Sequence, residues 1–132
     1  PLRLVGSEMC IRDSFYRIIM PSISTHVLNS ENGTHVAGLT VTLTHIGPDG
    51  AKKIMFSEKT DAGGRILDSF DFPLKSNEIF EIEFKLSDIH MKKKGIYCSD
   101  IIFRVSFSSE NEKFHIPIIV SQNGASTWWS GE

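Results

Sequence analysis

The sequence lacks three features, and each absence excludes a class of protein. No apolar run approaches the roughly 20 residues that a membrane-spanning helix needs, so no membrane partner is expected. The formal net charge at pH 7 is only −2, which provides neither the basic surface of a nucleic-acid-binding protein nor an acidic tail. Cysteine is nearly absent, and no residue spacing matches a zinc site, so no metal site is expected.

We interpret the N-terminal segment, residues 1–19, as lying outside the folded domain. Residues 4–14, LVGSEMCIRDS, resemble a translated sequencing adapter, and Met20 fits a natural start. We therefore expect residues 1–19 to be a non-native leader and residues 20–132 to be one domain. The alternative is a natural extension or a damaged signal peptide. Without the leader the chain loses three arginines and two carboxylates, so the net charge moves by one unit, from −2 to −3.

Removing the leader also removes Cys10 and leaves Cys98 as the only cysteine. A single thiol cannot form an intramolecular disulfide, so nothing in the domain requires an oxidising compartment. The expected location is the cytoplasm.

Strict alternation of apolar and polar residues predicts β-strands. In residues 80–86, FEIEFKL, Phe80, Ile82 and Phe84 alternate with charged side chains. The same period is found in residues 23–29, 38–46, 53–57 and 101–107. The intervening NSENGTH, GPDG, DAGG and SSENEK segments have turn chemistry. The pattern indicates an all-β fold, a two-sheet sandwich of about eight strands.

One short helix is expected between the strands. Residues 87–95, SDIHMKKKG, offer Ser87 as a cap and Gly95 as a stop. The lysines at 92–94 are expected to face solvent.

Residues 113–121, KFHIPIIVS, depart from the one-sided pattern. Phe114, Ile116, Ile118 and Val120 form one apolar face, but the opposite face, which starts at His115, is also largely apolar. A strand that is apolar on both faces is covered on both faces, whereas a two-layer sandwich covers only one. The outer face is therefore expected to meet another subunit. Pro117 cannot donate to a β-ladder, which predicts an irregularity at that point.

Three polar residues could take part in catalysis: His26, Arg65 and His115. Each of them alone is weak evidence for an active site. A single histidine on a strand more often has a structural role, and an arginine after a glycine-rich turn is usually solvated. The segment before Arg65, DAGG, is too short to be a phosphate-binding loop.

Four strings together resemble the transthyretin-like family, and specifically its 5-hydroxyisourate hydrolases. Residues 24–29 read STHVLN where that family has Ser-Thr-His-Val-Leu-Asp, and residues 33–38 read GTHVAG where it has Gly-x-Pro-Ala-x-Gly, so the proline is missing. Residues 60–65, TDAGGR, match a Thr-Asp-x-x-Gly-Arg turn, and residues 114–121, FHIPIIVS, match Tyr-His-Val-Pro-Leu-Leu-Leu-Ser. The similarity runs from residue 20 to residue 127, in order and in spacing.

The resemblance implies a fold, an assembly and a site. It implies two four-stranded sheets and a homotetramer whose active sites line a channel between two dimers. It places the family's catalytic residues at His26, Arg65 and His115. The implied activity is hydrolysis of 5-hydroxyisourate, a small-molecule substrate of purine degradation, by histidine acid–base chemistry without a metal or organic cofactor.

The C-terminus departs from the family, which closes with Tyr-Arg-Gly-Ser after Ser-Thr. Here Trp128, Trp129 and Ser130 follow Ser126-Thr127, and we expect these three to contact substrate in the central channel. Trp129 has no charge and cannot replace an arginine. The alternative function is therefore a non-catalytic transthyretin-like protein that binds small molecules in a Trp-lined channel. A structural module of a larger surface protein, or an error in the last codons, also remains open.

The expected domain boundary gives a direct prediction. A chain that starts at Met20 should fold, assemble and melt like the full chain, because residues 1–19 are expected to contribute no core. Differential scanning calorimetry on both chains measures this. Insolubility of the shorter chain, or a loss of several kcal/mol in unfolding free energy, would show that the segment belongs to the domain.

Overall fold

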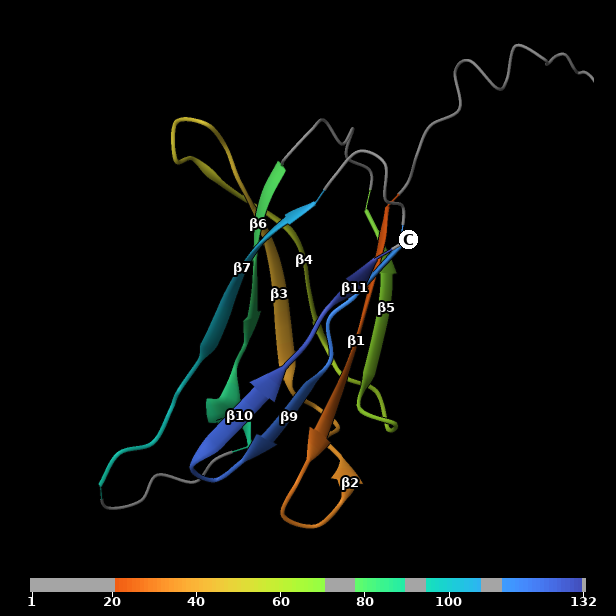
Figure 1. Ribbon diagram of the computed structural model, residues 1–132, viewed down its shortest axis with the longest axis vertical. Coiled ribbons are helices and arrows are strands. Elements are labelled where there is room, and N and C mark those ends of the chain that lie inside the picture. The colour runs from red at the N-terminus through yellow and green to blue at the C-terminus, as the bar shows by residue number, and fades with distance from the viewer. Residues whose placement is uncertain (1–20, 71–77, 90–94, 108–112, 132) are drawn as a thin grey trace, which may run out of the picture.

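The computed structural model describes residues 21–70, 78–89, 95–107 and 113–131, so the expected leader lies outside the described residues. Two β-sheets pack face to face (Figure 1). The described residues form these elements: β1 (Ser22–Asn29), β2 (Thr34–His35), β3 (Thr40–Ile46), β4 (Lys52–Lys59), β5 (Arg65–Ser69), β6 (Glu78–Phe84), a 3-10 turn (Leu86–Asp88), β7 (Ile101–Phe107), β8 (Lys113–His115), β9 (Ile118–Ser121), β10 (Gly124–Thr127) and β11 (Ser130–Gly131).

The larger sheet is built around β1. Its order is β10-β9-β1-β8-β11, and β5 and β2 pair with the other edge of β1. The smaller sheet has the order β4-β3-β6-β7. β8 and β9 continue one strand across a break, and so do β10 and β11. Counted in this way, and with the two-residue β2 set aside, the described residues give the predicted two-sheet sandwich of eight strands.

The predicted alternation places the core between the sheets. Phe80, Ile82 and Phe84 are fully buried, and β7 has the predicted bounds. Aromatic rings from both sheets meet there, since Phe107 stacks on Phe80 of its own sheet and on Phe114 of the other sheet. The buried apolar residues are Ile23, Val27, Val36, Leu39, Val41, Leu43, Phe56, Ile66, Phe70, Phe80, Ile82, Phe84, Leu86, Phe107, Phe114, Ile116, Ile118 and Val120.

The predicted irregularity at Pro117 is confirmed, because the strand is interrupted between β8 and β9. The interruption is held by polar contacts. The Thr25 hydroxyl donates to the Ile116 carbonyl at 2.6 Å, and the Ile116 N–H donates to the Ser24 carbonyl at 2.9 Å. The Thr127 hydroxyl donates to the Pro117 carbonyl at 2.6 Å. β10 and β11 are thereby attached to the same break.

The predicted helix at residues 87–95 is wrong in its described part, and residues 90–94 lie outside the described residues. The structure has a single 3-10 turn, in which Ser87 is an internal residue and does not cap a helix. Contacts distant in sequence fix this turn. The Asp88 carboxylate accepts the Thr40 N–H at 2.9 Å, and the Ser87 N–H donates to the Ser99 carbonyl at 2.9 Å. Neither partner belongs to the local pattern that favoured a helix.

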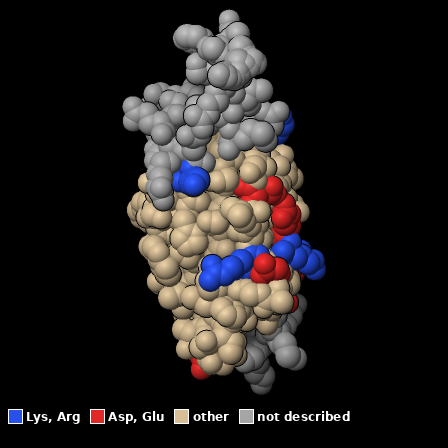
Figure 2. All heavy atoms as spheres, turned by 90° about the vertical axis from the view of Figure 1, so that its right-hand side faces the viewer, with Lys and Arg blue, Asp and Glu red and all other residues tan. Residues whose placement is uncertain are grey.

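The described residues contain no helix of the length and apolarity that crossing a bilayer requires. The side of the molecule on which β5 lies is mostly uncharged (Figure 2). Among the residues that Figure 2 colours, basic and acidic side chains lie side by side in a band across the middle, others lie separately above and below it, and no extended basic region is visible.

Candidate active site

Strand pairing places the predicted residues on the outer face of the larger sheet. On β1, Ile23, Thr25 and Val27 point into the core, so Ser24 and His26 point outward. His26 lies directly opposite Arg65 of β5, and Ser24 lies directly opposite His115 of β8. Residues opposite one another on neighbouring strands have Cβ atoms about 4.5–5.5 Å apart. His26, Arg65 and His115 therefore form one polar cluster.

His115 has a partner that sequence analysis missed. The Ser24 hydroxyl lies 2.7 Å from Nδ1 of His115, and the tautomer of the ring decides which group donates. The contact fixes the orientation of the ring. Ser24 belongs to the same STHVLN string as His26 and shares its face, which is the signal that identifies it.

His26 has a second unpredicted partner. Its Nε2 lies 2.9 Å from Nδ1 of His35 on β2, and the two rings stack with centroids 5.0 Å apart and an interplanar angle of 26°. No sequence signal marks this pair, because β2 has only two residues and no strand periodicity. The string GTHVAG contains His35, but nothing in the string says that its side chain reaches β1.

The surroundings lower the pKa of His26 below its ordinary value of 6.5. Partial burial is the largest cause, followed by the positive charge of Arg65 and then by His35 and His115. A hydrogen bond with the Gly63 backbone acts in the opposite direction. His26 is therefore neutral at neutral pH and able to accept a proton.

The turn before β5 holds Arg65 in place. The Asp61 carboxylate accepts the backbone N–H groups of Gly63 and Arg65, each at 2.9 Å. The Arg65 N–H lowers the pKa of Asp61 most, and the Gly63 N–H and the charges of Arg65 and His26 lower it further, against the opposing effect of burial. The carboxylate stays ionised and partly balances the charge of the arginine. The TDAGGR string therefore forms a turn in which the Asp61 carboxylate holds the backbone of Gly63 and Arg65.

Residues 23–129 match the HIUase/Transthyretin family. The chain belongs to that family. The curated 5-hydroxyisourate hydrolase of Halalkalibacterium halodurans is 26% identical over 116 residues, which cover 80% of this chain and 94% of the relative.

Two solved structures of the family show the same fold. Transthyretin from Sparus aurata matches with a TM-score of 0.71 at 15% identity, over 83% of this chain and 97% of the other. The 5-hydroxyisourate hydrolase of Klebsiella pneumoniae matches with a TM-score of 0.64 at 21% identity, over 84% and 99%. At these identities the likeness shows the HIUase/Transthyretin fold alone.

The C-terminal residues of this family member lie beside two hollows, and Ser130 lines both of them. Ser130 lies directly opposite His115, and both line a hollow of about 450 Å³ together with Ser24 and Leu67. Trp129 is 72% exposed and lines a different hollow, of about 220 Å³, together with core residues. Trp128 is 45% exposed and does not line either of these two hollows. In the single chain, Ser130 is therefore the C-terminal side chain beside the histidines.

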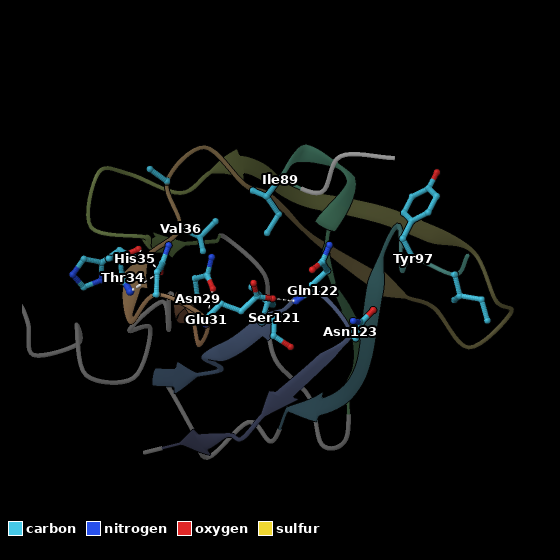
Figure 3. Close-up of a pocket in the computed structure, with 14 residues that line it drawn as sticks. Asn29, Glu31, Thr34, His35, Val36, Ile89, Tyr97, Ser121, Gln122 and Asn123 are labelled. Carbon is cyan, nitrogen blue, oxygen red and sulfur yellow. Dashed lines mark hydrogen bonds between the residues drawn. The ribbon is translucent and has the colours of Figure 1, made fainter. Parts of the chain in front are cut away.

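A larger hollow, of about 650 Å³, has few side chains that could take part in catalysis (Figure 3). Figure 3 shows His35 at one end and Tyr97 and Asn123 at the other. Half of its lining residues carry amide or hydroxyl groups and most of the others are apolar, and the Glu31 carboxylate accepts the Gln122 N–H. His26, Arg65 and His115 do not line it. Within the described parts of the chain, no group of three or more His, Cys, Asp or Glu side chains could hold a metal ion.

Gly64 gives a prediction about how the site is held together. It has a φ of +74°, and an added Cβ would lie 2.6 Å from the Val27 carbonyl oxygen and 3.1 Å from the His35 Cβ. Gly50 has a φ of +85° and open space around it, which makes it a matched control. Gly50→Ala should cost about 1–2 kcal/mol for the left-handed backbone. Gly64→Ala should cost a further 1–3 kcal/mol, roughly, for overpacking.

Urea unfolding of both variants measures the difference. Equal losses for Gly50→Ala and Gly64→Ala would show that the turn before β5 does not press against β1 and β2 as described.

Proposed function

We propose that this protein is a 5-hydroxyisourate hydrolase, with the activity carried by residues 20–132. The supporting observation is that His26, Arg65 and His115, which come from three strands, lie side by side on one face. The curated relatives that this chain matches over most of their length have this activity in their names. The family also contains transthyretin, so the site and not the fold carries the proposal.

The reaction adds water to a ring carbonyl of 5-hydroxyisourate and breaks the adjoining C–N bond. A base takes one proton from the attacking water, and the carbonyl oxygen becomes negatively charged. When the C–N bond breaks, the nitrogen takes a proton and the carbon keeps the hydroxyl group as a carboxylic acid. The site must therefore supply a base, an oxyanion partner and a proton donor.

The cluster supplies all three groups. His26 and His115 share water activation and proton return, and the lowered pKa of His26 keeps its ring neutral at pH 7. Arg65 binds the oxygen-rich substrate and stabilises the oxyanion. Ser24 orients His115, and Ser130 offers a hydroxyl beside it. These side chains supply every proton and charge that the reaction needs, so the proposal includes no metal or organic cofactor.

The site is completed by assembly into a homotetramer in the cytoplasm. Leu67 is 76% exposed and belongs to the same outer face as the histidines. Ile119 and Leu28, which pair across β9 and β1, are only half buried in the single chain. Covering this apolar part of the face with a second subunit would enclose the polar cluster in a channel, with Trp128 and Trp129 close enough to the channel to contact substrate.

The catalytic assignment predicts which substitutions abolish activity. Freshly prepared 5-hydroxyisourate should decay faster with the protein than without it, as followed by ultraviolet absorbance. His26→Ala and His115→Ala should each lower the rate about 10²–10⁴-fold, the usual contribution of a general acid or base. His45→Gln is the control, because His45 lies on β3 in the opposite sheet and pairs there with Glu78.

The pH profile tests the same assignment. Because neutral His26 is the active form and its pKa is lowered, the rate should fall only as the pH drops below 6.5, the ordinary value for histidine. A tetramer with no activity at any pH would contradict the proposal and favour a small-molecule binding protein, as the exposed Trp128 and Trp129 suggest.

The assembly gives a separate prediction. Ile119→Glu should dissociate the tetramer, because it would bury a charge without a partner. Ile54→Glu is the matched control, since Ile54 is 64% exposed on β4 of the other sheet and should leave the tetramer intact. Light scattering at micromolar concentration distinguishes the two. If the unaltered protein is a monomer, the channel and its enclosed site are wrong.

A further inference from the structure

The His26–His35 pair is the feature of the site that the proposed reaction does not yet use. Nε2 of His26 and Nδ1 of His35 are 2.9 Å apart, with the rings stacked. His35 occupies the position at which the GTHVAG string departs from the Gly-x-Pro-Ala-x-Gly pattern. The side chain of a proline there has no hydrogen-bond donor or acceptor, so the pair is a property of this chain's own sequence.

The backbone around His35 is fixed from several directions. The Val36 N–H donates to the Val27 carbonyl at 3.0 Å, and the Thr60 hydroxyl donates to the Val36 carbonyl at 2.7 Å. A Cβ on Gly64 would lie 3.1 Å from the His35 Cβ, so the turn before β5 packs directly against this residue. The His35 side chain is exposed, but its starting point on β2 is set by these contacts.

The contact has a chemical consequence because a neutral imidazole carries only one N–H. If His26 donates through Nε2, its Nδ1 is left without a proton and His26 is a base at Nδ1. If His35 donates instead, His26 carries its own proton on Nδ1 and is a donor there. His26 also makes a hydrogen bond with the Gly63 backbone that raises its pKa, so this contact favours a proton on the ring nitrogen that faces Gly63. The contact of Nε2 with His35 and the contact with Gly63 together determine which nitrogen of His26 carries the proton.

We propose that His35 is a positioning residue for His26, which together with the Gly63 backbone holds the ring and its tautomer and so influences which of the two proton-transfer roles His26 takes. The inference rests on the proposed function, in which His26 and His115 share those roles. His35 acts through His26 and makes no contact with the substrate.

Every charged or titratable group that faces His26 contributes to its protonation. These groups are Arg65 on β5, Asp61 in the preceding turn, His35 on β2 and His115 on β8. The Arg65 charge lowers the pKa of His26 more than His35 does. Loss of His35 should therefore raise the pKa of His26 in part, while the effects of Arg65 and His115 remain.

The experiment compares His35→Ala with His35→Asn in the full chain. An asparagine amide can occupy the place of the His35 Nδ1 atom and keep the hydrogen bond, but it does not titrate. ¹⁵N NMR of the ring nitrogens measures the tautomer and the pKa of His26 without substrate. Steady-state kinetics with 5-hydroxyisourate measure kcat and KM. Thr34→Ala, on the same short strand, controls for disturbance of β2 itself.

The expected pattern separates the two variants. In both, the pKa of His26 and the acid limb of the rate profile should shift to higher pH. Only His35→Ala should mix the His26 tautomers and lower kcat, by about two- to tenfold for one neutral hydrogen bond, with KM unchanged. His35→Asn should retain the tautomer and the plateau kcat.

Three results would overturn the inference. The first is an unchanged His26 tautomer in His35→Ala. The second is equal loss of kcat in His35→Ala and His35→Asn. The third is a raised KM at constant kcat, which would place His35 against the substrate. If the unaltered protein does not hydrolyse 5-hydroxyisourate, the proposed function fails, while the NMR comparison still decides whether His35 controls His26.

Discussion

Hydrogen bonding along both edges of β1 is the constraint on which the rest of the structure depends. One edge pairs in parallel with β8 and then β9, and the other pairs antiparallel with β5 and then β2. The change from β5 to β2 occurs at Val27, whose N–H donates to the Gly64 carbonyl and whose carbonyl accepts the Val36 N–H. Because each residue of β1 has fixed partners, a slip of one position would turn His26 into the core and separate it from Arg65 and His115.

The strands could be predicted because the alternation of apolar and polar residues that indicates each strand lies within that strand's own sequence. Residues 80–86 alternate strictly and residues 101–107 nearly so; the structure buries the predicted face of the first segment and places the predicted face of the second against the core, where Phe107 is buried and Ile101, Phe103 and Val105 are partly buried. The helix expected at 87–95 is wrong at residues 87–89, and the reason is the opposite one. In its described part, the conformation depends on Thr40 and Ser99, which are distant in sequence, and no local pattern contains them.

The site was only partly predictable. His26, Arg65 and His115 follow from the resemblance to the family, and strand register explains why they meet. Ser24 could have been found, since it shares the face of His26 on the same strand. His35 could not, because its position depends on a turn and on the packing of Gly64 against β2. The residues proposed to carry the chemistry were thus visible in the sequence, whereas the contact of His35 with His26 depends on tertiary structure.

The central claim is that the outer face around His26, Arg65 and His115 binds an oxidised purine. A crystal structure of the assembled protein with urate, a stable compound of the same ring skeleton, tests this most directly. The account predicts that the ligand lies against these three side chains, with a second subunit closing the site. A ligand bound instead in the hollow between His35 and Tyr97, or one that does not touch the histidines, would contradict it.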